Sequence, residues 1–195
     1  MPERGSLFVV SGPSGVGKGT VVHRVLQARP DLMFSVSYTT RPPRAGEVDG
    51  QHYRFVSDDE FSRLVEDGAF LEWAEVFEER YGTPAGEVYR ALDEGGDVLL
   101  ELDIQGARSV RQKAPHAILV FLKPPSEEEL ARRLSARGTE SGEALEARTL
   151  EARKEMAESS WFDHVVVNDQ VDEAVAEVLA IIEKTAPPRH EGASS

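Results

Sequence analysis

The sequence predicts an α/β fold of three layers, in which helices cover both faces of a parallel central sheet. Short apolar runs typical of buried strands occur at residues 7–10, 98–102 and 117–122, and a shorter run follows at 165–167. Helical patterns lie between these runs, and strands that alternate with helices are typical of a parallel sheet. The chain has 195 residues, which is enough to bury a sizeable core.

Four segments carry the signals of helices, and one of them, residues 143–158, is rich in Ala, Glu and Arg with few large apolar side chains. Residues 20–28 directly follow the first expected strand. Residues 126–129 have the form of a capping box, and the helix that they open is expected to end at Arg137, before Gly138. Residues 171–185 repeat apolar side chains at the spacing of a helix that faces the core.

Two segments interrupt the alternation of strands and helices. Residues 35–91 combine adjacent prolines, many aromatic residues and short alternations, so we expect an inserted region with antiparallel strands, of mixed α/β class. Residues 126–158 are charged and helical, and we expect them to form a second insertion. Residues 187–195 lack an apolar anchor, as in a flexible tail. The predicted core then consists of residues 1–34, 92–125 and 159–186.

The composition argues against several classes of function. The formal net charge is −13 at pH 7, and phosphodiester backbones and anionic lipids repel such an acidic chain, so we expect neither nucleic acid nor a membrane as a partner. The chain has no cysteine, which excludes disulfides, thiolate metal ligands and a cysteine nucleophile. Its first residues lack the layout of a secretory signal, so we expect a cytoplasmic chain, and no protein partner is evident.

A glycine-rich loop between the first expected strand and helix is the strongest functional motif. Glycines allow backbone N–H groups to point at phosphate oxygens, and the following helix adds the positive end of its dipole. Lys18 adds a cation at the β/γ position of a bound nucleotide. The motif predicts a phosphate-binding loop (P-loop) for a nucleoside triphosphate, formed by Gly12, Pro13, Ser14, Gly15, Val16, Gly17, Lys18, Gly19 and Thr20.

The loop departs from the usual motif at one position. Gly19 follows Lys18, where a Ser or Thr usually places its hydroxyl on Mg²⁺, and Thr20 comes one residue later. Either Thr20 or a water takes the role of that hydroxyl, or the metal is coordinated more weakly. The order Gly-Lys-Gly-Thr also resembles that of adenylate kinases.

Two further segments carry candidate ligands. Adjacent prolines keep the segment of Arg41 and Arg44 extended, so the two guanidinium groups can clamp a terminal phosphate, although such a pair is more often part of a solvated loop. Asp103 ends the apolar run at 98–102, at the edge of the sheet where ligands bind. It could hold a water bound to magnesium or orient an arginine, or it could be a plain aspartate at the end of a strand.

With these motifs, further segments occur in the order and spacing of guanylate kinases. The matching segments are residues 12–18, 35–47, 50–53, 70–74, 81–83, 101–106, 133–140 and 166–168. The resemblance covers residues 5–185. Because the phosphate loop is intact, the chain resembles the catalytic enzymes rather than the guanylate-kinase-like scaffold modules.

The resemblance implies an enzyme that transfers the γ-phosphoryl group of ATP to GMP, and to dGMP, giving ADP and GDP with Mg²⁺. It implies a P-loop core of α/β/α type, a GMP-binding region at residues 35–91 and a helical lid at residues 126–158. The acceptor oxygen of GMP is anionic near neutral pH, so the reaction needs no strong general base. Catalysis would rest on positioning and on neutralisation of charge.

The resemblance also implies which residues bind GMP. Glu72 would accept hydrogen bonds from guanine N1–H and the exocyclic amine, whereas adenine has no N1 donor and would leave a buried carboxylate unpaired. Without the resemblance, Glu72 would be interpreted as a surface carboxylate, and Tyr53 and Tyr81 would be interpreted as core aromatics. The phosphate of GMP is assigned to Arg41, Arg44, Tyr53 and Tyr81. The rest of the GMP site is assigned to Ser37, Thr83, Glu47, Glu101 and Asp103.

On the ATP side, the resemblance implies that Arg133 and Arg148 reach the transferring phosphoryl group. Arg137 would contact ATP, and Asn168 would contact the adenine. Without the resemblance, helical arginines would be expected to pair with glutamates at a solvated surface. The candidate catalytic residues are Lys18, Arg41, Arg133 and Arg148, and the candidate metal ligand is Thr20.

Three other functions compete with this hypothesis. Another small-molecule kinase, such as a ribose bisphosphate kinase, would have no guanine edge to bind to Glu72 and Ser37. A module that binds a phosphopeptide in the GMP site would have a degraded phosphate loop, whereas this loop is intact. A regulatory GTPase is a weaker candidate, because the chain lacks an Asn-Lys-x-Asp motif.

Overall fold

Five strands form the central sheet in the order β2-β7-β1-β8-β9, and all of their pairings are parallel. The computed structural model describes residues 4–76, 78–136, 150 and 152–185. Four strands lie at the apolar runs of the sequence, whereas β2 has two residues and is too short to form such a run. The strands are β1 (Leu7–Ser11), β2 (Met33–Phe34), β7 (Val98–Glu101), β8 (Ile118–Lys123) and β9 (His164–Val167).

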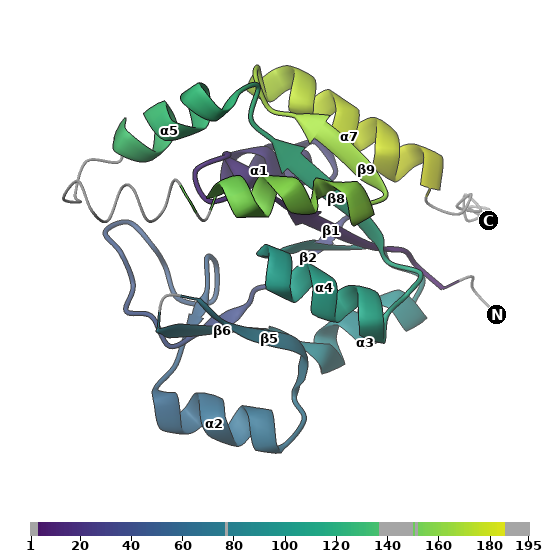
Figure 1. Cartoon of the computed structure of the whole chain (residues 1–195). Helices are drawn as coiled ribbons and strands as arrows, with labels where there is room; N and C mark the ends of the chain where they lie inside the picture. The colour runs from purple at the N-terminus through teal and green to yellow at the C-terminus, as the bar shows by residue number, and fades with distance from the viewer. Residues whose placement is uncertain (1–3, 77, 137–149, 151, 186–195) are drawn as a thin grey trace, which may run out of the picture.

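Helices cover both faces of this sheet, which confirms the expected three-layer fold (Figure 1). On one face lie α1 (Lys18–Ala28) and α7 (Val171–Thr185), and on the other lie α3 (Ala85–Asp93) and α4 (Ile104–Lys113). Buried side chains of β1 alternate between the two layers, because successive side chains of a strand point to opposite faces. The expected helices at 20–28 and 171–185 are confirmed.

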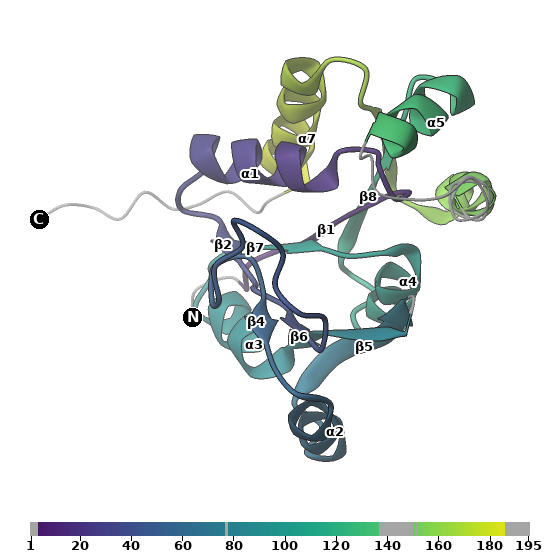
Figure 2. The same cartoon turned by 90° about the vertical axis from the view of Figure 1, so that its left-hand side faces the viewer.

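The segment between β2 and α3 forms a second sheet, in the order β4-β3-β6-β5. Strand β6 pairs antiparallel with β3 and β5, whereas β3 and β4 are parallel. The strands are β3 (Tyr38–Thr39), β4 (Arg54–Phe55), β5 (Phe70–Val76) and β6 (Glu79–Pro84). Helix α2 (Asp58–Glu66) lies beyond this sheet, at the opposite end of the molecule from α7 (Figure 2).

Helix α3 ends the inserted segment but packs on the central sheet. Its Val88 and Leu92 lie in the same core cluster as buried residues of β1 and β7. The expected boundary at residue 91 therefore falls inside a helix of the core. The division of the chain into core, GMP-binding insertion and lid stays a prediction.

The second insertion begins with α5 (Glu127–Ala136). The backbone N–H of Glu129 donates to Ser126 Oγ at 3.1 Å, which confirms the expected helix cap. The expected end of this helix at Arg137 and Gly138 lies outside the described residues, as does the expected tail.

Residues 152–157 are also helical and pack against α5. Ala152 forms a small apolar cluster with Leu130 and Leu134 of α5. Within the part of the chain that the structure describes, no helix has the length and apolar character needed to cross a membrane.

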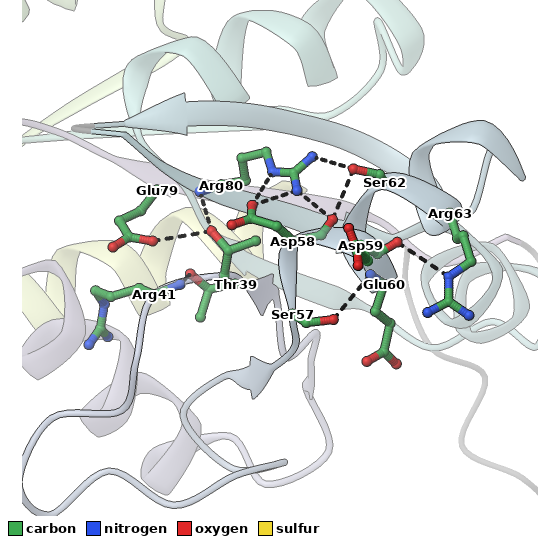
Figure 3. A network of polar contacts seen from close by, with 11 residues as sticks. Thr39, Arg41, Ser57, Asp58, Asp59, Glu60, Ser62, Arg63, Glu79 and Arg80 are labelled. Atoms are coloured by element: carbon green, nitrogen blue, oxygen red, sulfur yellow. Dashed lines mark hydrogen bonds and ion pairs between the residues drawn. The ribbon is translucent and has the colours of Figure 1, made fainter.

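Arg80 on β6 attaches α2 to the second sheet (Figure 3). Its guanidinium donates to Asp58 Oδ1 at 2.6 Å and to the Ser62 hydroxyl at 3.0 Å. The same group lies 4.8 Å from the centre of the Phe61 ring, which is fully buried. Because Tyr81 is the next residue on β6, these contacts fix a strand that carries a candidate GMP ligand.

We expect Arg80→Ala to lower the free energy of unfolding by about 1–2 kcal/mol, because it removes hydrogen bonds and the packing over Phe61. Most of this loss should come from packing, since Asp58 is exposed and its ion pair is screened by water. The control is Arg63→Ala on the exposed side of α2, which should change stability by less than about 0.5 kcal/mol. Urea unfolding measures both, and equal losses would contradict this role for Arg80.

Candidate active site

The phosphate loop joins β1 to α1. A Cβ atom at Gly12 would lie 2.3 Å from the carbonyl oxygen of Leu122, so only glycine fits there. Gly17 precedes α1 with a φ of 97°, a left-handed conformation that favours glycine. The Nζ atom of Lys18 donates to the carbonyl oxygens of Gly12, at 2.6 Å, and Pro13, at 3.3 Å. The ammonium group is therefore held at the beginning of the loop.

Asn168 and Arg133 contact the same carbonyl group of the loop. The Nδ2 atom of Asn168, a buried residue, donates to the carbonyl oxygen of Val16 at 2.8 Å. Arg133 Nη1 donates to the carbonyl oxygens of Val16, at 3.4 Å, and Asn168, at 3.0 Å. Both residues thus lie beside the phosphate loop, and their assigned contacts with ATP stay predictions. Arg137 and Arg148 lie outside the described residues.

A cavity of about 290 Å³ connects the phosphate loop with the second sheet. Lys18 and Gly19 of α1 line it together with Glu72 of β5 and Tyr81 of β6. Residues of α1 and of the second sheet therefore meet in one space. The candidate site residues that line it are Ser14, Gly15, Gly17, Lys18, Gly19, Ser37, Arg44, Tyr53, Glu72, Tyr81, Glu101 and Asp103.

Other candidate residues with described positions are not part of this lining. Thr20 is exposed on the first turn of α1, and its role as a metal ligand stays a prediction. Glu47 lines an adjoining cavity of about 370 Å³, which shares Gly19 and Tyr53 with the first. The full set outside the first lining is Gly12, Pro13, Val16, Thr20, Arg41, Glu47, Thr83, Arg133 and Asn168.

Arg41 is buried and paired within the chain. Its Nη2 atom donates to Glu47 Oε1 at 2.8 Å, and its guanidinium lies 5.4 Å from the centre of the Tyr53 ring. The other oxygen of Glu47 accepts the backbone N–H of Arg44 at 2.7 Å. The hydrogen bond from Arg41 lowers the pKa of Glu47, so this carboxylate stays ionised and holds both arginine positions. Burial raises the pKa of Tyr53 to about 12, so its phenol remains a hydrogen-bond donor.

Glu72 is a buried carboxylate on β5. The hydroxyl of Thr83, on β6, donates to Glu72 Oε1 at 2.5 Å. A Cβ atom at Gly106 would lie 2.9 Å from Glu72 Oε2, so the glycine allows α4 to approach this carboxylate. Burial raises the pKa of Glu72 to about 7, against the opposing effect of the Thr83 hydrogen bond. A buried acceptor of this kind is suited to pair with the donor edge of a bound ligand.

This shifted pKa predicts how Glu72→Gln changes stability with pH. A carboxyl group with a pKa of about 7 in the folded protein and about 4.5 in the unfolded chain costs stability as the pH rises through that range. Glutamine does not ionise, so we expect the variant to gain about 2–3 kcal/mol over the wild type between pH 5 and pH 8. Urea unfolding at both values measures this gain. Glu75→Gln, exposed on the same strand, is the control, and a pH-independent difference for Glu72→Gln would contradict the assignment.

Two further carboxylates lie where β7 ends. Asp103 Oδ1 accepts the backbone N–H of Gly106 at 2.6 Å and caps α4. Burial raises the pKa of both Glu101 and Asp103, and the nearby charge of Lys18 opposes this rise. A Cβ atom at Gly19 would lie 3.7 Å from Glu101 Oε2. A small side chain at this position would therefore be in ordinary van der Waals contact with Glu101.

Glu155 is a residue of this site that the sequence did not indicate. Its Oε2 atom accepts the backbone N–H of Ser14 at 3.2 Å, and its side chain lines the cavity. The two residues are separated by 141 positions in the chain. In the sequence, Glu155 is one of many glutamates in a charged helical stretch, and no local pattern distinguishes it.

The chain is similar to guanylate kinases in sequence and in structure. The guanylate kinase family model matches residues 4–185. A guanylate kinase of Thermobifida fusca is 54% identical over 181 residues, which cover 93% of this chain and 91% of that protein. A guanylate kinase of Caldanaerobacter subterraneus is 50% identical over 180 residues, which cover 92% and 87%. The crystal structure of guanylate kinase from Anaplasma phagocytophilum superposes with a TM-score of 0.80 at 33% identity, covering 94% of this chain and 87% of that one. The chain belongs to the guanylate kinase family.

Proposed function

We propose that the cavity binds ATP on the phosphate loop and GMP on the second sheet, so that the γ-phosphoryl group passes directly between them. The overall activity follows from the family: the chain is a nucleotide-binding P-loop kinase that phosphorylates GMP with ATP. One observation carries the assignment of residues, namely that Lys18 and Glu72 line the same cavity.

On the ATP side, the N–H groups of the loop and Lys18 hold the triphosphate. Arg133, which contacts the loop at Val16, supports this arrangement from α5. With Arg148, it neutralises charge on the transferring group. Arg137 and Asn168 complete the contacts with ATP.

On the GMP side, two arginines and two tyrosines hold the phosphate, and Glu47 positions both arginines. Glu72 accepts the N1–H and 2-amino hydrogens of guanine, with support from the Thr83 hydroxyl. Ser37, which lines the same cavity, completes the contacts with the base. The phosphate ligands are Arg41, Arg44, Tyr53 and Tyr81.

The chemistry requires positioning more than proton transfer. The acceptor is an anionic phosphate oxygen of GMP, so this chain has to bring two negative groups together and stabilise the charge that moves between them. Lys18 and Arg41 provide positive charge on the two sides of the transfer. Exclusion of water from the cavity prevents hydrolysis of ATP.

The acidic residues of the cavity fit a magnesium ion bound with ATP. Magnesium is usually held by one or two carboxylates together with substrate phosphates and water. Glu101 and Asp103 line the cavity with Lys18 and would supply such carboxylates. Thr20 is the hydroxyl candidate on α1. When bound, Mg²⁺ neutralises charge on the β- and γ-phosphates.

The substrates in this proposal are ATP and either GMP or dGMP. The reaction takes place in the cytoplasm, and the enzyme binds no nucleic acid, membrane or protein partner. The net charge of −13 supports the exclusion of polyanionic partners. A coupled assay of ADP release with GMP, dGMP, AMP, UMP and CMP tests the substrate range. We expect turnover with GMP and dGMP only, and comparable turnover with AMP would contradict the guanine assignment.

A further inference from the structure

Glu155 accepts a hydrogen bond from a backbone amide of the phosphate loop. The amide of Ser14 belongs to the loop whose N–H groups bind phosphate, and the Glu155 carboxylate accepts this amide hydrogen at 3.2 Å. The side chain lines the nucleotide cavity together with Lys18 and Gly17. An anion of the chain itself thus lies where the loop binds an anionic ligand.

Packing around the loop keeps Glu155 in this place. Leu134 of α5 approaches Gly15 so closely that a Cβ atom there would lie 2.8 Å from its Cδ2. Leu130 and Leu134 also pack against Ala152, one turn before Glu155. The apolar cluster therefore connects the loop, α5 and residues 152–157, and it carries the carboxylate to the Ser14 amide.

We propose that Glu155 competes with the phosphates of ATP for the Ser14 amide and thereby lowers the affinity of the loop for ATP. A carboxylate and a phosphate cannot both accept one amide hydrogen at full strength, and two anions at contact distance repel each other. ATP must therefore displace Glu155 from Ser14. This inference rests on the proposed assignment of ATP to the phosphate loop.

The test is the affinity for ATP of Glu155→Gln, measured by calorimetry in the presence of EDTA so that no metal contributes. Glutamine keeps the size and an acceptor oxygen but removes the negative charge. We expect the Kd for ATP to fall by about five- to tenfold, and the gain to shrink at high salt. Glu177→Gln, which removes the same charge from the exposed side of α7, should leave the Kd unchanged.

An unchanged or higher Kd in Glu155→Gln would overturn the proposal and would make Glu155 a structural support of the loop. A damaged fold cannot imitate the expected result, because unfolding weakens binding. Backbone amide NMR of the wild type distinguishes a wrong assignment of ATP to the loop from a wrong role for Glu155. If the amide signals of residues 14–19 do not move on addition of ATP, the assignment of ATP to the loop is wrong. If they move and Glu155→Gln does not bind more tightly, only the role of Glu155 is wrong.

Discussion

Lys18→Ala is expected to lower turnover with ATP and GMP by about three orders of magnitude while the fold remains intact. Lys18 begins α1, and its ammonium group is held at the start of the phosphate loop by the carbonyl oxygens of Gly12 and Pro13. Its charge neutralises a phosphoryl group in transfer more than one in the ground state, so the loss should appear in kcat more than in KM.

Steady-state kinetics measure the effect of Lys18→Ala, and circular dichroism verifies the fold. Lys18→Arg should restore little activity, because a planar guanidinium does not reproduce the compact ammonium group. Lys184→Ala, at the end of α7, removes the same charge from a residue that does not line the cavity and should retain wild-type turnover. Near-normal turnover in a folded Lys18→Ala would show that the catalytic assignment is wrong.

Glu72→Gln is expected to reduce kcat/KM for GMP by about 30- to 1000-fold, which corresponds to about 2–4 kcal/mol. Glu72 is buried and already accepts the Thr83 hydroxyl. When Glu72 is ionised, both of its oxygens can only accept hydrogen bonds. Glutamine would present an N–H₂ group to a guanine donor and would carry no charge. The KM for ATP should change little, because the phosphate loop lies in another part of the cavity.

A comparison of kcat/KM among nucleotides that differ in the base tests the role of Glu72 more directly than kcat/KM for GMP alone. Inosine monophosphate keeps the N1–H of guanine but lacks its 2-amino group, so it should be a poorer substrate than GMP for the wild type. In Glu72→Gln this preference should shrink, and AMP should gain slightly because its N1 is an acceptor. Competitive kinetics with the three nucleotides compare the variant with the wild type and with Glu75→Gln. If Glu72→Gln keeps the wild-type ratio of GMP to inosine monophosphate, Glu72 does not bind the 2-amino group.

Local sequence patterns predicted much of the fold correctly. The apolar runs marked β1, β7, β8 and β9, because a strand buried on both faces must be apolar throughout. The cap at Ser126 and the glycines of the phosphate loop were also predicted, since both depend on the conformation of a few consecutive residues. Strand β2 was not, because two residues carry no periodicity.

The sequence by itself determined the three-layer class, the place of the phosphate loop and the residue types available for two nucleotides, because glycine conformation, helix caps and apolar periodicity act over neighbouring residues. Only the tertiary structure decided that Glu72 is buried and that Glu101 is half-buried. It also decided that Glu47 pairs with Arg41 and that Glu155 reaches Ser14. Burial and such pairings depend on how segments far apart in the chain are brought together. A local sequence pattern carries no information about which distant segments will be in contact.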